Sequence, residues 1–196
     1  ALIVIFVLVL FLGNLRAGLI VASAIPLSML FALGLMNVFG VSANLMSLGA
    51  IDFGLIVDGA VIIVEATLHH LGMRKAIGKL SQSEMDNEVF VSASKIRSSA
   101  AFGEIIILIV YIPILTLVGI EGKMFSPMAQ TVSFAIIGAL ILSLTYIPMM
   151  CAAFLSKNVS HKQTLSDRMM NFFQRIYAPL LEKAIRFKKV IVGVTV

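Results

Sequence analysis

The chain has 196 residues, of which 60% are hydrophobic and 13% are charged, and it contains a single cysteine, Cys151. Soluble domains have about a quarter of their residues charged, so this composition excludes an ordinary soluble domain and indicates an integral membrane protein; one cysteine excludes an internal disulfide and a cysteine-based zinc cluster. The formal net charge of +5 is explained by where the basic residues lie, and it does not indicate a nucleic-acid partner.

The apolar segments predict an all-α membrane protein, with a bundle of transmembrane helices over residues 1–155. A helix needs about 20 mostly apolar residues to cross a bilayer. We expect both ends to be cut from a longer chain, because the first apolar run is short and residues 190–196 begin another run that is too short to span. The predicted spans are residues 1–12, 17–39, 45–68, 100–119 and 127–155.

The basic residues predict the orientation of this bundle. All Lys and Arg residues except Lys123 lie in the turn at 14–16, the loop at 69–98 or the segment at 156–189. Loops rich in Lys and Arg remain on the cytoplasmic side of a membrane. These three segments are therefore predicted to be cytoplasmic, and the connection that contains Lys123 is predicted to face the opposite side.

Two amphipathic helices are predicted on the cytoplasmic side. Ser81 and Glu84 have the spacing of a capping box, and an apolar stripe follows them within the 69–98 loop. Residues 156–189 combine a second apolar stripe with basic residues that suit lipid head groups. We expect these helices to lie on the cytoplasmic membrane interface. Binding to a partner protein is the alternative.

The predicted span at 45–68 carries three carboxylates, Asp52, Asp58 and Glu65. A charged residue at the centre of a bilayer costs roughly 3 kcal/mol, so each of them needs a partner or a proton. On one continuous helix Asp58 and Glu65 fall within about 20° of each other, whereas Asp52 lies roughly 120° away from Asp58. The pattern predicts a proton or ion path. No Lys or Arg lies at mid-depth in a predicted span, so a neutralising cation is expected from outside this chain.

Small residues accompany these acids. Gly49, Gly54 and Gly59 recur every five residues and allow neighbouring helices to approach closely. At Gly59 the missing side chain also leaves room for a water molecule or for a side chain from the facing helix. Glu104, one turn inside the next predicted span, is expected to be an interfacial residue near Arg97, and a functional role is the alternative.

Residues 52–65, Asp-Phe-Gly-Leu-Ile-Val-Asp-Gly-Ala-Val-Ile-Ile-Val-Glu, resemble the fourth-span signature of the heavy-metal efflux branch of the resistance–nodulation–division (RND) transporters. Residues 43–49 and 111–128 resemble the same branch. The resemblance covers nearly the whole chain. It implies that the chain holds spans two to six of an RND N-terminal half.

The resemblance implies a proton-driven exporter of divalent cations of the cobalt–zinc–cadmium type in the bacterial inner membrane. Such proteins act as homotrimers with a periplasmic adaptor and an outer-membrane channel, within membrane lipid. The proton-relay acids of the family match Asp52, Asp58 and Glu65, and Gly59 follows the central Asp as in the metal branch. Ala66 departs from the usual Asn of the family, which puts hydrogen bonding at the cytoplasmic end in doubt. No cofactor is expected.

Two other functions fit parts of the pattern. The copper/silver subtype of the same family resembles a ladder of Met residues, and Met46, Met124 and Met128 are the weak candidates for metal ligands. Most of the methionines are expected to fill gaps in the core. A membrane lipid-sensing or scaffolding module without transport would not need intramembrane acids.

An enzyme is not expected, because there is no nucleophile–base pair and the adjacent His69 and His70 fit an interfacial polar pair better than a metal site.

Overall fold

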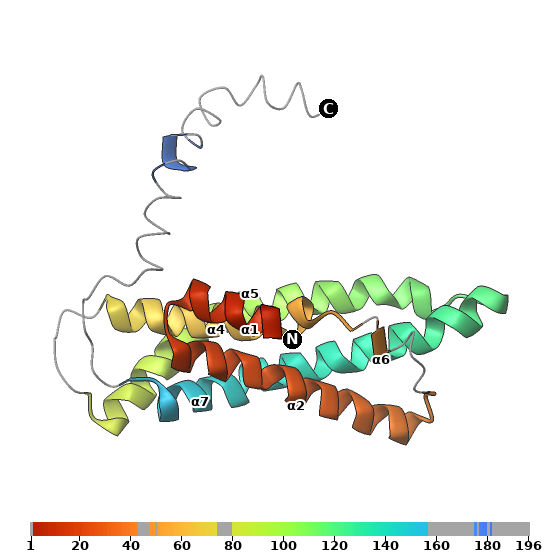
Figure 1. The fold of residues 1–196 in the computed structure, drawn as a ribbon, viewed down its shortest axis with the longest axis horizontal. Coiled ribbons are helices and arrows are strands. Elements are labelled where there is room, and N and C mark those ends of the chain that lie inside the picture. Colours follow the sequence, from red (N-terminus) through yellow and green to blue (C-terminus); the bar gives the residue numbers. More distant parts are fainter. Residues whose placement is uncertain are drawn as a thin grey trace. The chain divides into compact units, whose positions relative to one another are not determined.

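The computed structural model describes residues 2–42, 48–49, 51–73, 80–156, 175, 177–179 and 181. The chain divides into two units, Ala1–Ser160 and His161–Val196. Every regular element described in the first unit is a helix (Figure 1). The helices are α1 (Leu2–Leu12), α2 (Leu15–Phe39), α4 (Phe53–Gly72), α5 (Gln82–Leu115), α6 (Gly119–Leu144) and α7 (Tyr146–Phe154).

The predicted all-α membrane fold is confirmed. Helices α2, α4, α5 and α6 are long and apolar enough to cross a membrane, and α1 is a shorter apolar helix of 11 residues. In the second unit, residues 175, 177–179 and 181 are helical. The rest of the helix predicted over residues 156–189, and the apolar start at 190–196, lie outside the described residues.

Local signals in the sequence set both ends of α2. Asn14 caps its N-terminus, with Oδ1 accepting hydrogen bonds from the backbone N–H groups of Arg16 at 3.0 Å and Ala17 at 3.5 Å. At the other end Gly40 has φ 66°, a left-handed conformation that glycine adopts without strain. The predicted turn at 14–16 and the predicted span at 17–39 are thus found almost where the sequence places them.

Helix α5 corrects the prediction of a separate interfacial helix before the span at 100–119. The capping box is present, with Ser81 N donating to Glu84 Oε2 at 2.9 Å and Glu84 N donating to Ser81 Oγ at 3.3 Å. From this cap the helix continues for 34 residues, because no Gly or Pro interrupts residues 82–102. Its first apolar stripe is buried in the bundle, where Met85 is 0% exposed, instead of lying on the lipid surface.

The last predicted span, residues 127–155, is also different in the structure. It consists of most of α6 and all of α7, separated at Thr145, whose hydroxyl donates to the backbone carbonyl of Ile141 at 2.6 Å. Pro148 is compatible with the first turn of α7, because the backbone N–H that proline lacks has no helical partner there. Residues 120–126, predicted as a connection, form the first turns of α6 instead.

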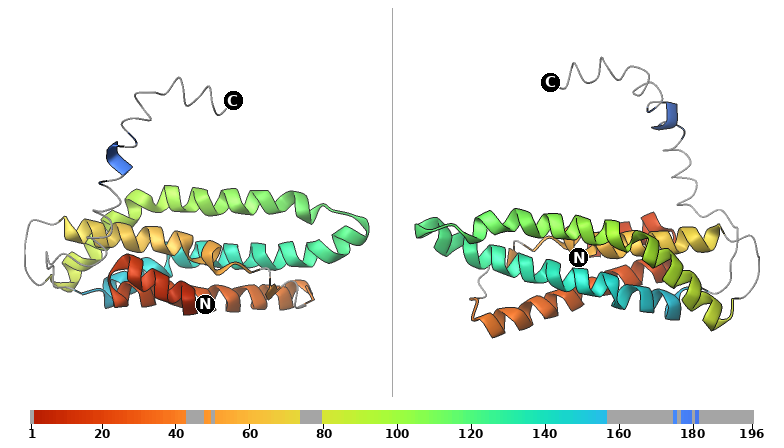
Figure 2. Two further views of the ribbon diagram at one scale, coloured as in Figure 1. Left: turned by 45° about the horizontal axis from the view of Figure 1, so that its top comes forward. Right: turned by 180° about the vertical axis from the view of Figure 1, so that it is seen from behind.

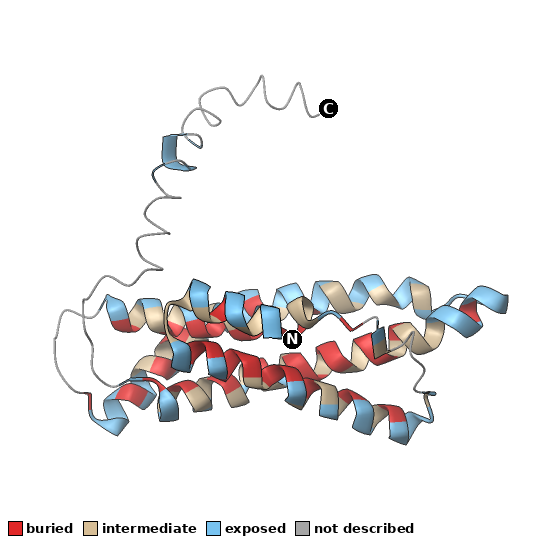
Figure 3. Ribbon diagram, viewed as in Figure 1, coloured by how far each residue is buried: buried red, intermediate tan, exposed pale blue. Residues whose placement is uncertain are grey.

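Packing concentrates the core on one part of the bundle. Figure 2 shows α5 and α6 as a long antiparallel hairpin, and the main core cluster joins residues of α2, α4, α5 and α7. A smaller cluster joins α2, α4 and α6 around Ile56 and Ala135. In Figure 3 the apolar half of α5 is largely exposed, and Ala100 and Glu104 are its only buried residues.

Candidate functional site

The candidate site is built on α4, and its first acid lies at the start of that helix. The predicted continuous helix over residues 45–68 is wrong at this point, because Ile51 and Asp52 are not helical and α4 begins at Phe53. Asp52 is the N-cap, and its Oδ1 accepts a hydrogen bond from Gly54 N at 2.8 Å. Aspartate is among the best capping residues because its carboxylate satisfies an N–H group that has no helical partner.

Gly54 lets this cap form closely. A Cβ atom at residue 54 would lie 3.1 Å from Asp52 Oδ1, which is tighter than an ordinary contact.

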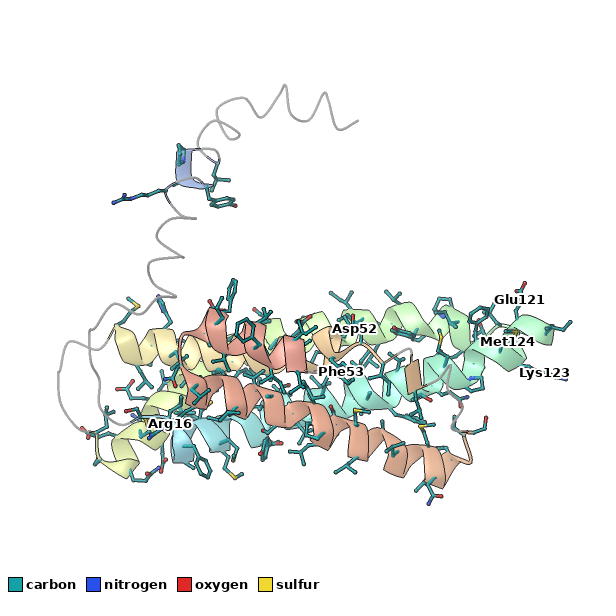
Figure 4. The ribbon with its side chains drawn as sticks, in the orientation of Figure 1. Arg16, Asp52, Phe53, Glu121, Lys123 and Met124 are labelled. Carbon is teal, nitrogen blue, oxygen red and sulfur yellow. The ribbon has the colours of Figure 1, made fainter. Side chains whose placement is uncertain are left out.

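Figure 4 places Asp52 and Phe53 between the two ends of the bundle, with Arg16 towards one end and Glu121, Lys123 and Met124 at the other. The helix that carries the acids therefore begins partway along the bundle, and not at its end.

The three predicted relay acids share an exposed location. Asp52, Asp58 and Glu65 are each exposed, although the residues between them on α4 are mostly buried or half-buried. None of the three forms an ion pair with another described residue. Asp58 and Glu65 thus lie on one exposed face of α4 and Asp52 at its exposed start, and none of these carboxylates has a cation beside it within the described part of the chain.

The opposite face of α4 contacts α5 and α6 through Gly59. A Cβ atom at this position would collide with Glu104 Oε1 from α5 and would lie 3.2 Å from Ser143 Oγ of α6. The prediction that Gly59 leaves room for a side chain from a facing helix is therefore confirmed. The prediction for Glu104 is wrong, since this side chain lies inside the bundle and is only 2% exposed. Gly49, in contrast, has no atom within 4 Å of a Cβ position.

Polar contacts join the end of α4 to the beginning of α5. The buried hydroxyl groups of Thr67 and Ser92 are 3.0 Å apart, so one donates to the other, and each also lies within hydrogen-bond distance of a backbone carbonyl of its own helix. One turn further on, His70 Nε2 lies 2.9 Å from Glu88 Oε2. His70 therefore belongs to a helix-to-helix pair, as expected for an interfacial polar residue. His69, exposed beside it, has no metal-binding neighbours among the described residues.

The methionine candidates do not gather at the acids. Met124 is 47% exposed near the start of α6, and Met128 lies one turn further along the same helix. Figure 4 shows Met124 at the end of the bundle, away from Asp52. Met46 lies outside the described residues. Within the described ranges, no three His, Cys, Asp or Glu residues are grouped closely enough to hold a metal ion.

Two carboxyl groups, each able to bind a proton, lie close to Gly59. Asp58 and Gly59 are neighbours in the sequence, so the exposed carboxyl group of Asp58 and the buried carboxyl group of Glu104 lie on adjoining sides of the same helical turn. Sequence reasoning gave Glu104 a functional role only as the alternative and did not predict its contact with Gly59. The available signals were an acid inside an apolar segment with no basic residue at its depth, and a glycine directly after the central Asp.

Comparison with known proteins finds relatives along the whole chain. The AcrB/AcrD/AcrF family matches residues 1–196. The chain is 48% identical to the cobalt-zinc-cadmium resistance protein CzcA of Cupriavidus metallidurans over 187 residues, which are 94% of this chain and 17% of that protein. It is 45% identical to the nickel-cobalt-cadmium resistance protein NccA of Alcaligenes xylosoxydans xylosoxydans over 187 residues, with the same two shares.

A solved structure agrees with the fold. The second crystal form of a heavy metal efflux pump matches with a TM-score of 0.77 at 34% sequence identity, over 99% of this chain and 17% of that one. The chain therefore spans about a sixth of the length of the relatives that it matches. The resemblance seen in residues 43–65 and 111–128 extends over the whole chain.

Proposed function

Because the chain belongs to the AcrB/AcrD/AcrF family, and within it to the heavy-metal efflux branch of the RND transporters, we propose that it forms part of a proton-driven exporter of divalent heavy-metal cations. The activity is that of a whole transporter, of which this chain supplies a membrane-spanning part. The observation that carries the proposal is the set of three exposed acids, with Asp52 at the start of α4 and Asp58 and Glu65 on its open face.

The physical argument starts from the cost of a charge in a membrane. An ionised carboxylate facing hydrocarbon is unfavourable by roughly 3 kcal/mol, and acids within spans almost always face a bundle interior or a water-filled path. Asp58 and Glu65 are exposed on α4 and have no cation beside them in the described residues. We therefore expect another protein segment to cover this face and to form the proton path together with Asp52, Asp58 and Glu65.

Asp58 is the central carrier in this proposal. It lies within α4, whereas the Asp52 carboxylate is engaged in capping the helix. A proton that crosses the whole membrane potential contributes about 2.3 kcal/mol per 100 mV, which is the energy available for uphill export. An acid that cannot titrate would break this coupling.

The test is Asp58→Asn in the complete transporter that contains this chain. The substitution keeps the shape of the side chain but removes its titration, so we expect zinc export against a gradient to stop while expression and assembly persist. Asp86→Asn is the matched control, because Asp86 lies on an exposed part of α5 and accepts a hydrogen bond from Gln82 at 2.8 Å. Uphill zinc transport by reconstituted Asp58→Asn protein at near wild-type rate would refute the relay.

The choice of ion is proposed from the relatives and from ligand chemistry. The names of CzcA and NccA state resistance to cobalt, zinc, cadmium and nickel. Soft thioether ligands select cuprous ion, and α4, which carries Asp58 and Glu65, contains no Met from Phe53 to Gly72. We expect the transporter to protect a sensitive host against zinc, cobalt or cadmium more than against copper or silver. Protection confined to copper and silver would overturn this choice.

We also propose that the protein assembles as a homotrimer with a periplasmic adaptor and an outer-membrane channel. We further propose that it lies in the inner membrane, with the α2–α4 connection in the periplasm and the α4–α5 connection in the cytoplasm. Ser42 and Ser94 are exposed labelling sites on the two sides. With buried Cys151 replaced by Ala, an impermeant thiol reagent applied outside spheroplasts should label Ser42→Cys and spare Ser94→Cys. The reverse pattern would invert the orientation.

A further inference from the structure

Glu104 is buried in a helix whose apolar neighbours are exposed. It is 2% exposed, while Phe102, Ile105 and Ile106 on the same turn are 64%, 41% and 57% exposed. Neither carboxyl oxygen of Glu104 makes a hydrogen bond of good geometry with a described residue, and the nearest polar groups are the Ser143 hydroxyl and the Gly59 backbone N–H. From residue 100 to its end, α5 thus directs its one acidic side chain into the protein and most of its large apolar side chains outwards, which is the orientation typical of a functional acid within a membrane.

No cation lies beside this carboxyl group among the described residues. From α4, Gly59 lies against Oε1, and Asp58 is the ionisable group whose charge acts on Glu104. From α6, Ser143 lies beside it, but the Ser143 hydroxyl donates to the backbone carbonyl of Leu140 at 3.0 Å. The charged residues at the start of α6, Glu121 and Lys123, lie at the far end of the bundle (Figure 4).

A packing role alone does not account for this arrangement. An isolated ionised carboxylate is strongly disfavoured in a buried apolar environment, and such a group takes up a proton instead of remaining charged. Leu or Met would fill the same volume without burying unpaired oxygen atoms. The glycine at residue 59 gives the carboxyl group this position, because a Cβ atom there would force the Glu104 side chain to move.

We propose that Glu104 is a fourth proton-carrying residue, which holds a proton in the α4–α5–α6 interface and exchanges it with Asp58 past Gly59. This inference rests on the proposed function, since it adds a member to the relay of Asp58. It gives the proton path a branch from the open face of α4 into the bundle. The chemical species carried is a proton, and the partner group is a carboxylate.

The exchange is a simple proton transfer. When Asp58 is protonated and Glu104 is ionised, the O–H bond on Asp58 breaks and an O–H bond on Glu104 forms. The negative charge passes from Glu104 to Asp58, and nothing is oxidised or reduced. The reverse transfer returns the proton to the open face, where Asp58 can release it along the path.

The first experiment compares uphill zinc export by the complete transporter in proteoliposomes across a range of pH. Glu104→Gln keeps the shape and polarity of the side chain but removes its titration. We expect export to fall by about 100-fold, the lower part of the range for a positioned proton-transfer group. Glu121→Gln on the exposed first turn of α6 should match the wild type. Glu104→Gln with a wild-type rate and pH profile would overturn the proposal.

The second experiment follows the proton itself. An acid-minus-alkaline infrared difference spectrum of the wild-type transporter should contain a carboxylic acid carbonyl band that Glu104→Asp shifts and Glu121→Gln leaves in place. This measurement also covers the case in which Glu104→Gln does not fold. A spectrum in which no band responds to Glu104→Asp would overturn the proposal.

Asp58→Asn, measured beside these variants, separates the two hypotheses. If Asp58→Asn transports zinc uphill normally, the relay itself fails. If Asp58→Asn is inactive while Glu104→Gln is fully active, the relay stands and only the role of Glu104 fails.

Discussion

The two faces of α4 differ in the exposure of their polar side chains and in the partners that these side chains have. The exposed face presents Asp58 and Glu65 with no ion-pair partner in the described chain, whereas the opposite face is closed by Gly59, Ile63 and Thr67 against neighbouring helices. On the closed face Thr67 shares a hydrogen bond with Ser92, but Glu104 at Gly59 has none. The carboxyl groups of Asp58 and Glu104 therefore lie on two sides of one turn of α4, the turn that contains Asp58 and Gly59.

This difference separates groups that stabilise the bundle from groups that are retained for function. A hydroxyl that bonds to a backbone carbonyl and to a second hydroxyl meets the requirement for buried polar groups. A buried carboxyl with no partner does not, and it is destabilising by the desolvation of its oxygen atoms. We infer that the bundle retains Glu104 in spite of its effect on stability. The following substitutions test this contrast, from the largest expected effect to the smallest.

Replacing Glu104 by an apolar side chain should stabilise the protein and impair transport at once. Glu104→Met removes two buried unpaired oxygen atoms and keeps a long flexible side chain in the space. We expect a gain of about 2 kcal/mol in the free energy of unfolding, which is the size of the desolvation penalty of such a group. The measurement is the thermal unfolding midpoint of the detergent-solubilised transporter, read together with zinc export. A lower midpoint would indicate that Glu104 stabilises the fold.

Gly59→Ala should disturb the contact between the two faces. The added methyl group collides with the carboxyl group of Glu104 and approaches Ser143, so we expect a loss of about 1 kcal/mol in stability, at the low end for overpacking because the Glu104 side chain can move. Gly103→Ala is the matched control, because no atom lies within 4 Å of a Cβ at that position. The control should be neutral or slightly stabilising. Equal midpoints for the two variants would contradict the collision.

The Thr67–Ser92 pair should show the modest effect of a satisfied polar contact. Thr67→Val keeps the shape and removes the hydroxyl group, while Ser92 retains its bond to the backbone carbonyl of Val89 at 3.1 Å. We expect a loss of about 1 kcal/mol and unchanged transport. A double-mutant cycle with Ser92→Ala measures the coupling between the two hydroxyl groups. Zero coupling would mean that the 3.0 Å contact contributes nothing to stability.

The His70–Glu88 pair should matter least. Both side chains are partly exposed, at 32% and 25%, and ion pairs of this kind contribute between zero and about 1 kcal/mol. We expect His70→Ala to lower the free energy of unfolding by less than about 0.5 kcal/mol. The unfolding midpoint measured at low and high salt is the check. A large loss that persists at high salt would show that the pair is more than a surface contact.

Local sequence signals predicted much of the fold. The apolar runs predicted the membrane helices, Asn14 and Gly40 mark the ends of α2, and the Ser81–Glu84 capping box marks the start of α5. These features depend on neighbouring residues alone, through caps and backbone conformation. The sequence also predicted Asp58 and Glu65 on one side of α4, because their spacing of seven residues is two helical turns.

Helix boundaries were less predictable where two acceptable local structures compete. Asp52 could continue a helix or cap one, and the structure uses it as a cap. Residues 82–115 contain a polar half and an apolar half, and packing of Met85 and Val89 in the core keeps both halves in one helix. A hydrophobic stripe does not specify whether lipid or protein will cover it, so tertiary contacts decided between a surface helix and a core helix.

The sequence by itself determined that this is a helical membrane protein with acids inside a span, since composition, caps and helical spacing are properties of single segments. Only the tertiary structure decided which acids are exposed, as Asp58 and Glu65 are, and which is buried, as Glu104 is. Glu104 and Gly59 are 45 positions apart in the sequence, and nothing local to either one reveals that they meet. Their contact arises from the packing of α4, α5 and α6, where the missing Cβ of a glycine makes room for a carboxyl group from another helix.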